Sequence, residues 1–229
     1  AIPLKKDEKD FVEIADSIAA YEKSTDYLNR LDSINNRVTL LNILMNGIDH
    51  YNRKKGLKWV IDPLITQMRV AGVGGYRHSI GGNIIKTYKN NKELDVYTKA
   101  DYGFGNNDLL INGKLQFTYL PKKFARLSVA GGSKYQMLTY MQNIAAVFSR
   151  SNFVRNDFIE FGHEHELFNG LTLRVTTKYM QRTSIEGLNT AEWSDELFGS
   201  NNTPREFEAY NEFNLKINLS YTPFLKYAM

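Results

Sequence analysis

The chain has 229 residues, no cysteine, a formal net charge of +4 and a hydrophobic content of 42%. Its mean hydropathy of −0.42 excludes a bundle of transmembrane helices, and the absence of cysteine excludes disulfides, thiol catalysis and thiolate metal sites. The sequence pI is near 9.0, but basic and acidic residues are interspersed and form no basic run. We therefore expect no nucleic-acid partner.

The first part of the chain predicts short amphipathic helices. Apolar residues recur at three- and four-residue intervals from 5 to 34, and Ser24 and Thr25 are expected to interrupt the pattern as helix caps. Such helices could lie on a membrane surface, plug a lumen, dock on a partner or pack as solvated helices. Because the chain begins with Ala1, we expect either processing or a longer parent protein. The predicted organisation is an amphipathic helical leader at 1–36 followed by a β region at 37–229.

Strict alternation of apolar and polar residues dominates the rest of the chain. In 93–104, Leu94, Val96 and Ala100 alternate with Asp95, Lys99 and other polar residues. The same period returns in 111–119, 171–179 and 213–221. A period of two indicates β-strands. Blocks this long match the ~9–11 residues of a strand tilted across a membrane better than the ~5–6 of a soluble strand.

Strands that cross a bilayer must close into a barrel, because lipid offers no hydrogen bonds to a free sheet edge. The fold class that we predict is an all-β, antiparallel transmembrane β-barrel, or an incomplete wall of a longer barrel, with a short N-terminal helical leader. The residues predicted to face lipid are Leu94, Val96, Ala100, Ile111, Leu115, Leu173, Val175, Leu215, Ile217 and Leu219. The predicted aromatic girdle comprises Phe104, Tyr119, Tyr179, Phe213 and Tyr221. The alternative is a water-soluble barrel or sandwich with the same alternation.

Seven strands are predicted, at 76–86, 93–104, 109–119, 124–132, 158–168, 171–182 and 207–221. Weaker candidates lie at 40–51 and 57–70. Barrels in bacteria use even strand numbers of about eight or more, so the predicted wall is either just closed or incomplete. Long connections at 133–157 and 183–206 are expected at one end, and the turns at 120–123 and Asn169-Gly170 at the other.

Two motifs invite hypotheses of metal binding or catalysis. His163-Glu164-His165-Glu166 holds four potential metal ligands, but a strand sends the histidines to one face and the glutamates to the other, which leaves an incomplete zinc site. His78-Ser79 suggests the nucleophile and base of a lipid hydrolase, yet adjacent strand residues also point to opposite faces. We therefore predict no enzyme, no catalytic residues, no metal site and no cofactor.

The two long connections are where partner binding is expected. The segment 137–148 is rich in apolar residues, which favours a further strand or a helix rather than a free loop. The second connection carries Trp193 and Phe198, which we predict as possible partner contacts, since aromatic anchors on a rigid scaffold are typical of interaction surfaces.

A resemblance to a known family rests on short segments in a characteristic order. They include Ile2-Pro3-Leu4, Asp62-Pro63-Leu64, Gly81-Gly82-Asn83, Tyr102-Gly103-Phe104 and the run 148–153. In these segments the chain resembles an uncharacterised outer-membrane β-barrel family of Bacteroidota, whose barrel usually follows a carboxypeptidase-regulatory-like domain. The resemblance covers essentially the whole chain and implies a barrel in the cell outer membrane without established catalytic residues.

The function expected from these observations is structural. The chain is predicted to act as a scaffold in contact with outer-membrane lipid and other envelope proteins, as a subunit of a larger complex that handles exported proteins or lipoproteins. The first alternative is a channel or transporter for small anionic solutes, lined by Lys99, Lys114, Arg174, Lys178 and Lys216. A lipid hydrolase of the outer membrane ranks third.

Overall fold

A computed structural model of the chain describes residues 6–71, 73–138, 150–186, 188 and 204–222. It begins with two helices, α1 at Lys6–Glu22 and α2 at Thr25–Asn35. Ser24 is the N-cap of α2, and its hydroxyl accepts a hydrogen bond from the Tyr27 backbone N–H. The predicted helical leader and its interruption at Ser24 are thus confirmed.

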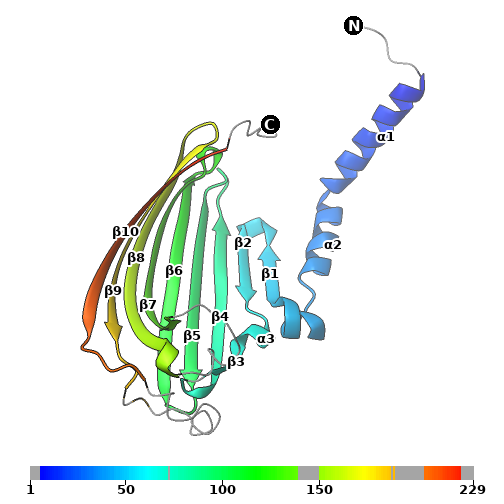
Figure 1. Ribbon diagram of the computed structural model, residues 1–229. Helices are drawn as coiled ribbons and strands as arrows, with labels where there is room; N and C mark the ends of the chain where they lie inside the picture. Colours follow the sequence, from blue (N-terminus) through cyan, green and yellow to red (C-terminus); the bar gives the residue numbers. More distant parts are fainter. Residues whose placement is uncertain (1–5, 72, 139–149, 187, 189–203, 223–229) are drawn as a thin grey trace.

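The leader contacts the sheet through its second helix and the residue that follows it. Figure 1 shows α2 beside β1 (Ile48–Asn52) and α1 projecting away from the sheet. The Asn36 side chain donates to the Tyr51 carbonyl at 2.9 Å and accepts from the Tyr51 N–H at 2.7 Å. Because this amide pairs with β1 as a neighbouring strand would, it caps part of that sheet edge. On α1, by contrast, Phe11, Ile14 and Ile18 are exposed.

The remainder of the chain is an antiparallel sheet. After β1 come β2 (Leu57–Ile61), α3 (Leu64–Gln67), β3 (Met68–Ala71), β4 (Gly75–Thr87), β5 (Glu93–Gly103), β6 (Asp108–Leu120), β7 (Ala125–Met137), β8 (Phe153–Phe168), β9 (Leu171–Thr183) and β10 (Tyr210–Tyr221). The sheet has ten strands in the order β1-β2-β4-β5-β6-β7-β8-β9-β10, with β3 paired to the start of β4. Nearly every strand therefore pairs with its neighbour in sequence.

The sheet curves strongly but is not closed (Figure 1). β1 and β10 are its two edges, and within the described part of the chain nothing pairs with the free side of β10. Almost every residue of β10 is exposed. The predicted antiparallel sheet with a helical leader is confirmed, whereas closure into a barrel is not observed.

The connections separate by length as predicted. The turns at 88–92, 121–124 and 169–170 lie at one end of the long strands, which we call the short-turn end. The strand ends that flank the connections 138–152 and 184–209 lie at the opposite, long-loop end, together with the turn at 104–107. The apolar segment 137–148 lies almost wholly outside the described residues.

Three predicted boundaries were wrong. β7 continues to Met137 and β8 begins at Phe153, so the connection between them is shorter than the predicted 133–157. The weak candidate at 40–51 is a π-helical turn at Asn42–Asn46 followed by β1. The candidate at 57–70 divides into β2, α3 and β3, because Pro63 is the N-cap of α3. Among the described helices, none combines the length and apolarity needed to cross a membrane.

Candidate functional site

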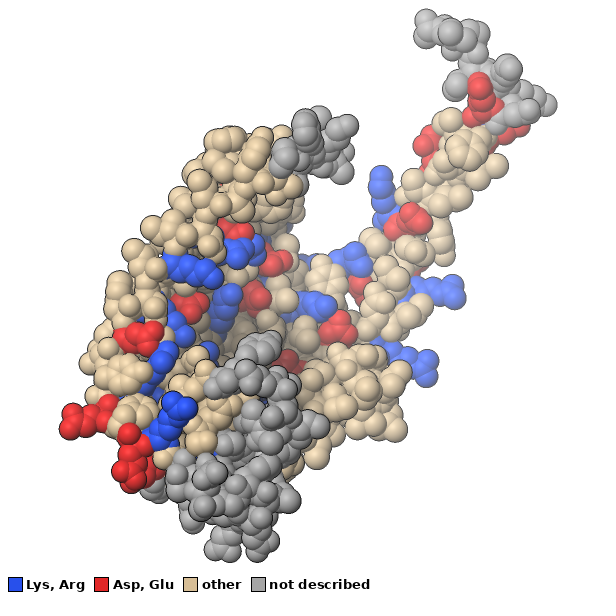
Figure 2. Space-filling view, viewed as in Figure 1, with Lys and Arg blue, Asp and Glu red and all other residues tan. Residues whose placement is uncertain are grey.

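The cross-strand register sorts the side chains of β4–β10 into two faces. Directly opposed residues form one mostly polar row: Asn83, Tyr97, Lys114, Ala130, Glu160, Lys178 and Asn214. Their sequence neighbours form a mostly apolar row: Ile84, Val96, Leu115, Val129, Phe161, Thr177 and Leu215. Figure 2 shows charged side chains gathered in the hollow of the curved sheet. We call this side the inner face and the apolar side the outer face.

The residues predicted to face lipid all lie on the outer face. Val96 opposes Leu115, Ala100 opposes Ile111, and the pairing of β9 with β10 places Leu173, Val175, Leu215, Ile217 and Leu219 on the same side. Leu94 opposes Phe117 and belongs to this face as well. In β10, Leu215, Ile217 and Leu219 are about 60% exposed. The register thus places these residues on one face, and their contact with lipid stays a prediction.

The predicted girdle residues lie at both ends of the strands. At the long-loop end, the Phe104 ring stacks on Tyr76 and meets the edge of Tyr102. Tyr179 and Phe213 lie opposite each other and belong to the part of β9 and β10 nearer that end. At the short-turn end, Tyr221 opposes Leu171 and Tyr119 stacks on His163. Trp193 and Phe198 lie outside the described residues.

The histidine motif divides between the two faces as predicted. His163 and His165 stack on the outer face, and the Tyr119 hydroxyl lies 2.8 Å from His163 Nε2. Glu164 points inward to Arg126 and Arg174. Within the described ranges, no group of three or more His, Asp or Glu side chains is placed to hold a metal ion.

His78 and Ser79 do not contact each other as base and nucleophile. Ser79 is buried and its hydroxyl donates to the Gln67 carbonyl at 3.2 Å. His78 Nδ1 instead lies 3.1 Å from the Tyr76 hydroxyl. The two side chains belong to opposite faces, so this pair lacks the hydrogen bond that activates a serine.

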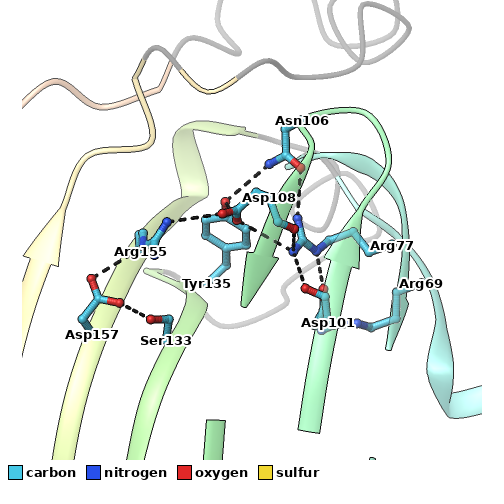
Figure 3. Close-up of polar contacts among 9 residues, drawn as sticks. All are labelled: Arg69, Arg77, Asp101, Asn106, Asp108, Ser133, Tyr135, Arg155 and Asp157. Atoms are coloured by element: carbon cyan, nitrogen blue, oxygen red, sulfur yellow. Dashed lines mark hydrogen bonds and ion pairs between the residues drawn. The ribbon is translucent and has the colours of Figure 1, made fainter. Parts of the chain in front are cut away.

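An arginine cluster occupies the inner face near the long-loop end (Figure 3). Arg77 on β4 is 2% exposed, and its Nε donates to Asp101 Oδ1 on β5 at 2.5 Å. Arg69 on β3 donates to the other oxygen of the same carboxylate. Asp101 is itself 3% exposed. A carboxylate buried this deeply is stable only because two guanidinium groups bind it.

The cluster continues across the sheet to β8. The Arg77 guanidinium lies over the Tyr135 ring, 5.0 Å from its centroid, and the Tyr135 hydroxyl donates to Asp108 at 2.5 Å. Arg155 Nη1 lies 3.4 Å from the other oxygen of Asp108, and Arg155 also approaches Asp157. Figure 3 shows these side chains meeting near the turn that carries Asn106. We define the arginine cluster as Arg69, Arg77, Asp101, Asp108, Tyr135 and Arg155.

The β7–β8 hairpin reaches the cluster because it departs from β6. The pairing of β6 with β7 ends at Asn112 opposite Gly132, whereas β7 and β8 stay paired to Met137 opposite Phe153. Gly132 has a φ of +128°, and a Cβ there would lie 2.2 Å from the Ile111 carbonyl oxygen. Only glycine allows this approach without strain.

A small hydrophobic core covers the same end of the inner face. Val73, Phe153 and Ile185 are buried together, and Tyr135, Met137 and Leu188 pack against them. The core draws on the segment before β4, the β7–β8 hairpin and the start of the β9–β10 connection. This end of the inner face is therefore packed against protein rather than open.

Two hollows lie on the inner face. The one beside the arginine cluster has a volume of ≈ 230 Å³ and is lined by residues such as Lys99, Asn112 and Lys134. The other, of ≈ 280 Å³, is nearer the short-turn end and includes Lys114. In it, Glu164 accepts from Arg126 and Arg174 at 2.7–2.8 Å.

The lysines predicted to line a lumen all lie on the inner face. Cross-strand pairing places Lys99, Lys114, Lys178 and Lys216 there, together with Arg174. None of these four lysines forms an ion pair with a residue that the structure describes, whereas Arg174 pairs with Glu164. The inner face thus combines arginines that form ion pairs with lysines that form none within the described ranges, and Glu160 lies opposite Lys178 in the register.

Comparison with known protein families shows which family the chain matches. Residues 41–229 match the C-terminal domain of a family of unknown function, DUF5686. The chain belongs to this family. The predicted membership of an uncharacterised family is thereby confirmed, and the matched region of this DUF5686 domain includes every strand of the sheet. Neither the curated proteins nor the solved structures include a significant match.

Sequence reasoning missed the arginine cluster of the DUF5686 domain. Its hydrogen bonds join residues 24–47 positions apart, such as Arg77 with Asp101 and Arg155 with Asp108. One signal was available, because Arg77 and Asp101 both fall in the inward phase of adjacent predicted strands, at the same end of the hairpin. Opposite charges so placed in a hairpin are expected to pair.

Proposed function

We propose that this DUF5686 domain forms the wall of a β-barrel in the outer membrane and that its role is structural. The observation that carries the proposal is the outer face, whose apolar rows run from β4 to β10 while the same strands keep their charges inside. Monomeric soluble proteins rarely expose apolar patches beyond a few hundred Å². Hydrocarbon is the environment that suits such a surface.

Strand length supports the same proposal. β5 has 11 residues, hence a length of ~36 Å and a height of ~28 Å at a tilt of about 40°. The apolar band of known outer-membrane barrels is about 25 Å tall. Closure belongs to the proposal, because the edge of β10 would need a further strand as a partner in lipid.

A scaffold is favoured over an open pore by the long-loop end of the inner face. The hydrophobic core and the arginine cluster cover that end, so a continuous aqueous path is not expected there. The resemblance to outer-membrane barrels of Bacteroidota that follow a carboxypeptidase-regulatory-like domain supports the location. The exposed apolar side chains of α1 and the exposed β10 support a subunit of a larger envelope complex that handles exported proteins or lipoproteins.

Spin labelling along β9 tests the membrane wall directly. Because the chain has no cysteine, single cysteines can be introduced from Leu171 to Thr183 without removing native ones. In bilayers we expect labels at odd positions to collide mainly with oxygen, which concentrates in lipid, and labels at even positions to collide with a water-soluble nickel chelate. Absence of this alternation, or a protein that is freely soluble without amphiphile, would refute the wall.

Isolation of the full-length product in mild detergent tests the complex. We expect envelope proteins to co-purify with it in fixed proportion and to be lost when α1 is deleted. A strictly monomeric species without co-purifying proteins would contradict the scaffold role while leaving the membrane wall intact.

The unpaired lysines favour a second candidate, a channel for small anionic solutes. Lys99, Lys114, Lys178 and Lys216 give the inner face cations that form no ion pair with a described carboxylate. Planar-bilayer recording separates the two functions, since a scaffold gives no stable conductance and a channel gives an anion-selective one that falls when these lysines are replaced by methionine.

A further inference from the structure

The hollow beside the arginine cluster carries an excess of positive charge. Arg69, Arg77, Lys99 and Lys134 line it, and Asp101 is the acidic residue among its lining residues. Asp101 already accepts hydrogen bonds from both arginines. The two lysines therefore face the hollow without a carboxylate of their own.

Neither of these lysines is held by a close ion pair. Lys99 is half-buried, lies between Gly81 and Asn112 in the register and interacts electrostatically with Asp62. The Lys134 ammonium lies over the Phe158 ring, 4.9 Å from its centroid. Within the described part of the chain neither lysine forms an ion pair. A partly buried ammonium group is strongly stabilised by an anion that hydrogen-bonds to it.

The lining of the hollow also includes apolar side chains. Val73, Leu110 and Phe153 contribute to its lining and are all less than 10% exposed. Its volume of ≈ 230 Å³ exceeds the ~150 Å³ of an apolar protein cavity known to hold benzene. The space is therefore large enough for one aromatic or short branched group together with an acidic group.

We propose that this hollow binds a small organic carboxylate with an apolar body about the size of benzoate. The carboxylate lies between the ammonium groups of Lys99 and Lys134, where the Asn112 amide can also donate to it, and the apolar body packs against Leu110 and Phe153. The inference goes beyond the structural role proposed above and does not depend on it.

The neighbouring hollow provides an internal control. It is lined by Lys114, but its two arginines are neutralised by Glu164, and Glu160 supplies a further negative charge. No aliphatic or phenyl side chain belongs to its lining. Lys114 is thus an inner-face lysine like Lys99, in a site that does not suit an apolar anion.

The test uses para-fluorobenzoate as the probe and fluorine NMR of the full chain in lipid nanodiscs. We compare wild type with Lys99→Met, Lys134→Met and the control Lys114→Met, and we check that all variants share the wild-type melting temperature. Methionine keeps the apolar stem of lysine and removes its charge. The neutral para-fluorobenzamide serves as the uncharged analogue.

We expect saturable binding of para-fluorobenzoate to wild type and to Lys114→Met, and about tenfold weaker binding to Lys99→Met and to Lys134→Met, as befits loss of one charge-assisted hydrogen bond. Para-fluorobenzamide should bind to wild type no more tightly than para-fluorobenzoate binds to Lys99→Met or to Lys134→Met. Absence of saturable binding to wild type, equal binding to all variants, or equal affinity for the neutral analogue would each overturn the proposal.

Discussion

The two faces of β9 place side chains of opposite character on a single strand. Val175 and Tyr179 lie on the outer face, and their neighbours Arg174 and Lys178 lie on the inner face. The mean hydropathy of −0.42 averages over both and resembles that of a soluble protein. Polarity in this chain therefore differs between the two faces of each strand rather than between segments of the sequence. A register slip of one residue would exchange the two faces.

The inner face is itself divided. Near the long-loop end, the carboxylates of the arginine cluster are bound by guanidinium groups and covered by a hydrophobic core. Toward the short-turn end, the Arg126–Glu164–Arg174 group is partly exposed and lies beside Lys114, which forms no ion pair with a described residue. The outer face and the arginine cluster should therefore be sensitive to changes of charge, and the open part of the inner face should tolerate them.

Asp101→Asn should give the largest loss of stability. The change removes the negative charge from a carboxylate that is 3% exposed and leaves two guanidinium groups without it. Removing one partner of a buried ion pair costs about 3–5 kcal/mol of unfolding free energy. Urea titration of the protein folded into liposomes measures the change. The control is Asp95→Asn on the same strand and face, where the carboxylate accepts from Asn83 at 2.9 Å and forms no ion pair with a described residue. Equal effects of the two substitutions would mean that the arginine cluster is not a distinct stabilising unit.

Val129→Arg should give the second-largest loss of stability. Together with Ala130→Arg, it compares the two faces at adjacent residues. Val129 lies in the apolar outer row, and an arginine near the middle of the bilayer costs about 2–4 kcal/mol. Ala130→Arg introduces the same side chain on the inner face, between Lys114 and Glu160, and should change the unfolding free energy by less than about 1 kcal/mol. The same titration in liposomes measures both. A larger cost at Ala130 than at Val129 would reverse the assignment of the faces.

The alternation of apolar and polar residues predicted the faces of β5, β6, β9 and β10 because the apolar outer face and the polar inner face both extend along the whole strand. Leu215 and Lys216 differ by one position and lie on opposite faces, so each block contains its own evidence. The helical leader was equally predictable, since its period and the Ser24 cap are local features.

The alternation did not predict the structure where the chain leaves the two-faced sheet. Beyond Gly132, the β7–β8 hairpin leaves β6 and packs against protein, so Ser133–Met137 and Phe153–Asp157 no longer follow the pattern of the wall. Tyr135 and Arg155 contact Asp108 through a change of direction that depends on the backbone of one glycine. The arginine cluster forms because the hairpin turns away from β6, and the alternation of residues along the sequence does not encode that turn.

Glu164→Gln should have a smaller effect, because its arginine partners are 38% and 55% exposed. Loss of the carboxylate charge should lower the unfolding free energy by about 1 kcal/mol, the size typical of partly exposed ion pairs. In a double-mutant cycle with Arg174→Met, the coupling energy should account for most of that change. Glu160→Gln, whose carboxylate forms no ion pair with a described residue, is the matched control. A cost as large as that of Asp101→Asn would show that the inner face is not divided as we infer.

The smallest effect is expected at the junction of the leader with the sheet, where Asp32 and Arg53 lie in neither face. The Arg53 guanidinium donates to Asp32 at 2.7 Å, and this hydrogen bond lowers the pKa of Asp32 from its usual value of 3.8. Because the folded-state pKa lies below the unfolded one, the contact stabilises the junction fully above pH 3.8 and is lost as the pH falls through the folded-state pKa. Carbon NMR titration of the Asp32 carboxyl should show this depression, and Arg53→Met should return the pKa to its usual value. Asp26, which lies in the first turn of α2 and forms no ion pair with a described residue, is the matched control residue. A titration of Asp32 that is unchanged by Arg53→Met would mean that α2 is not held to the sheet by this pair, and the Asn36 amide would then account for the junction.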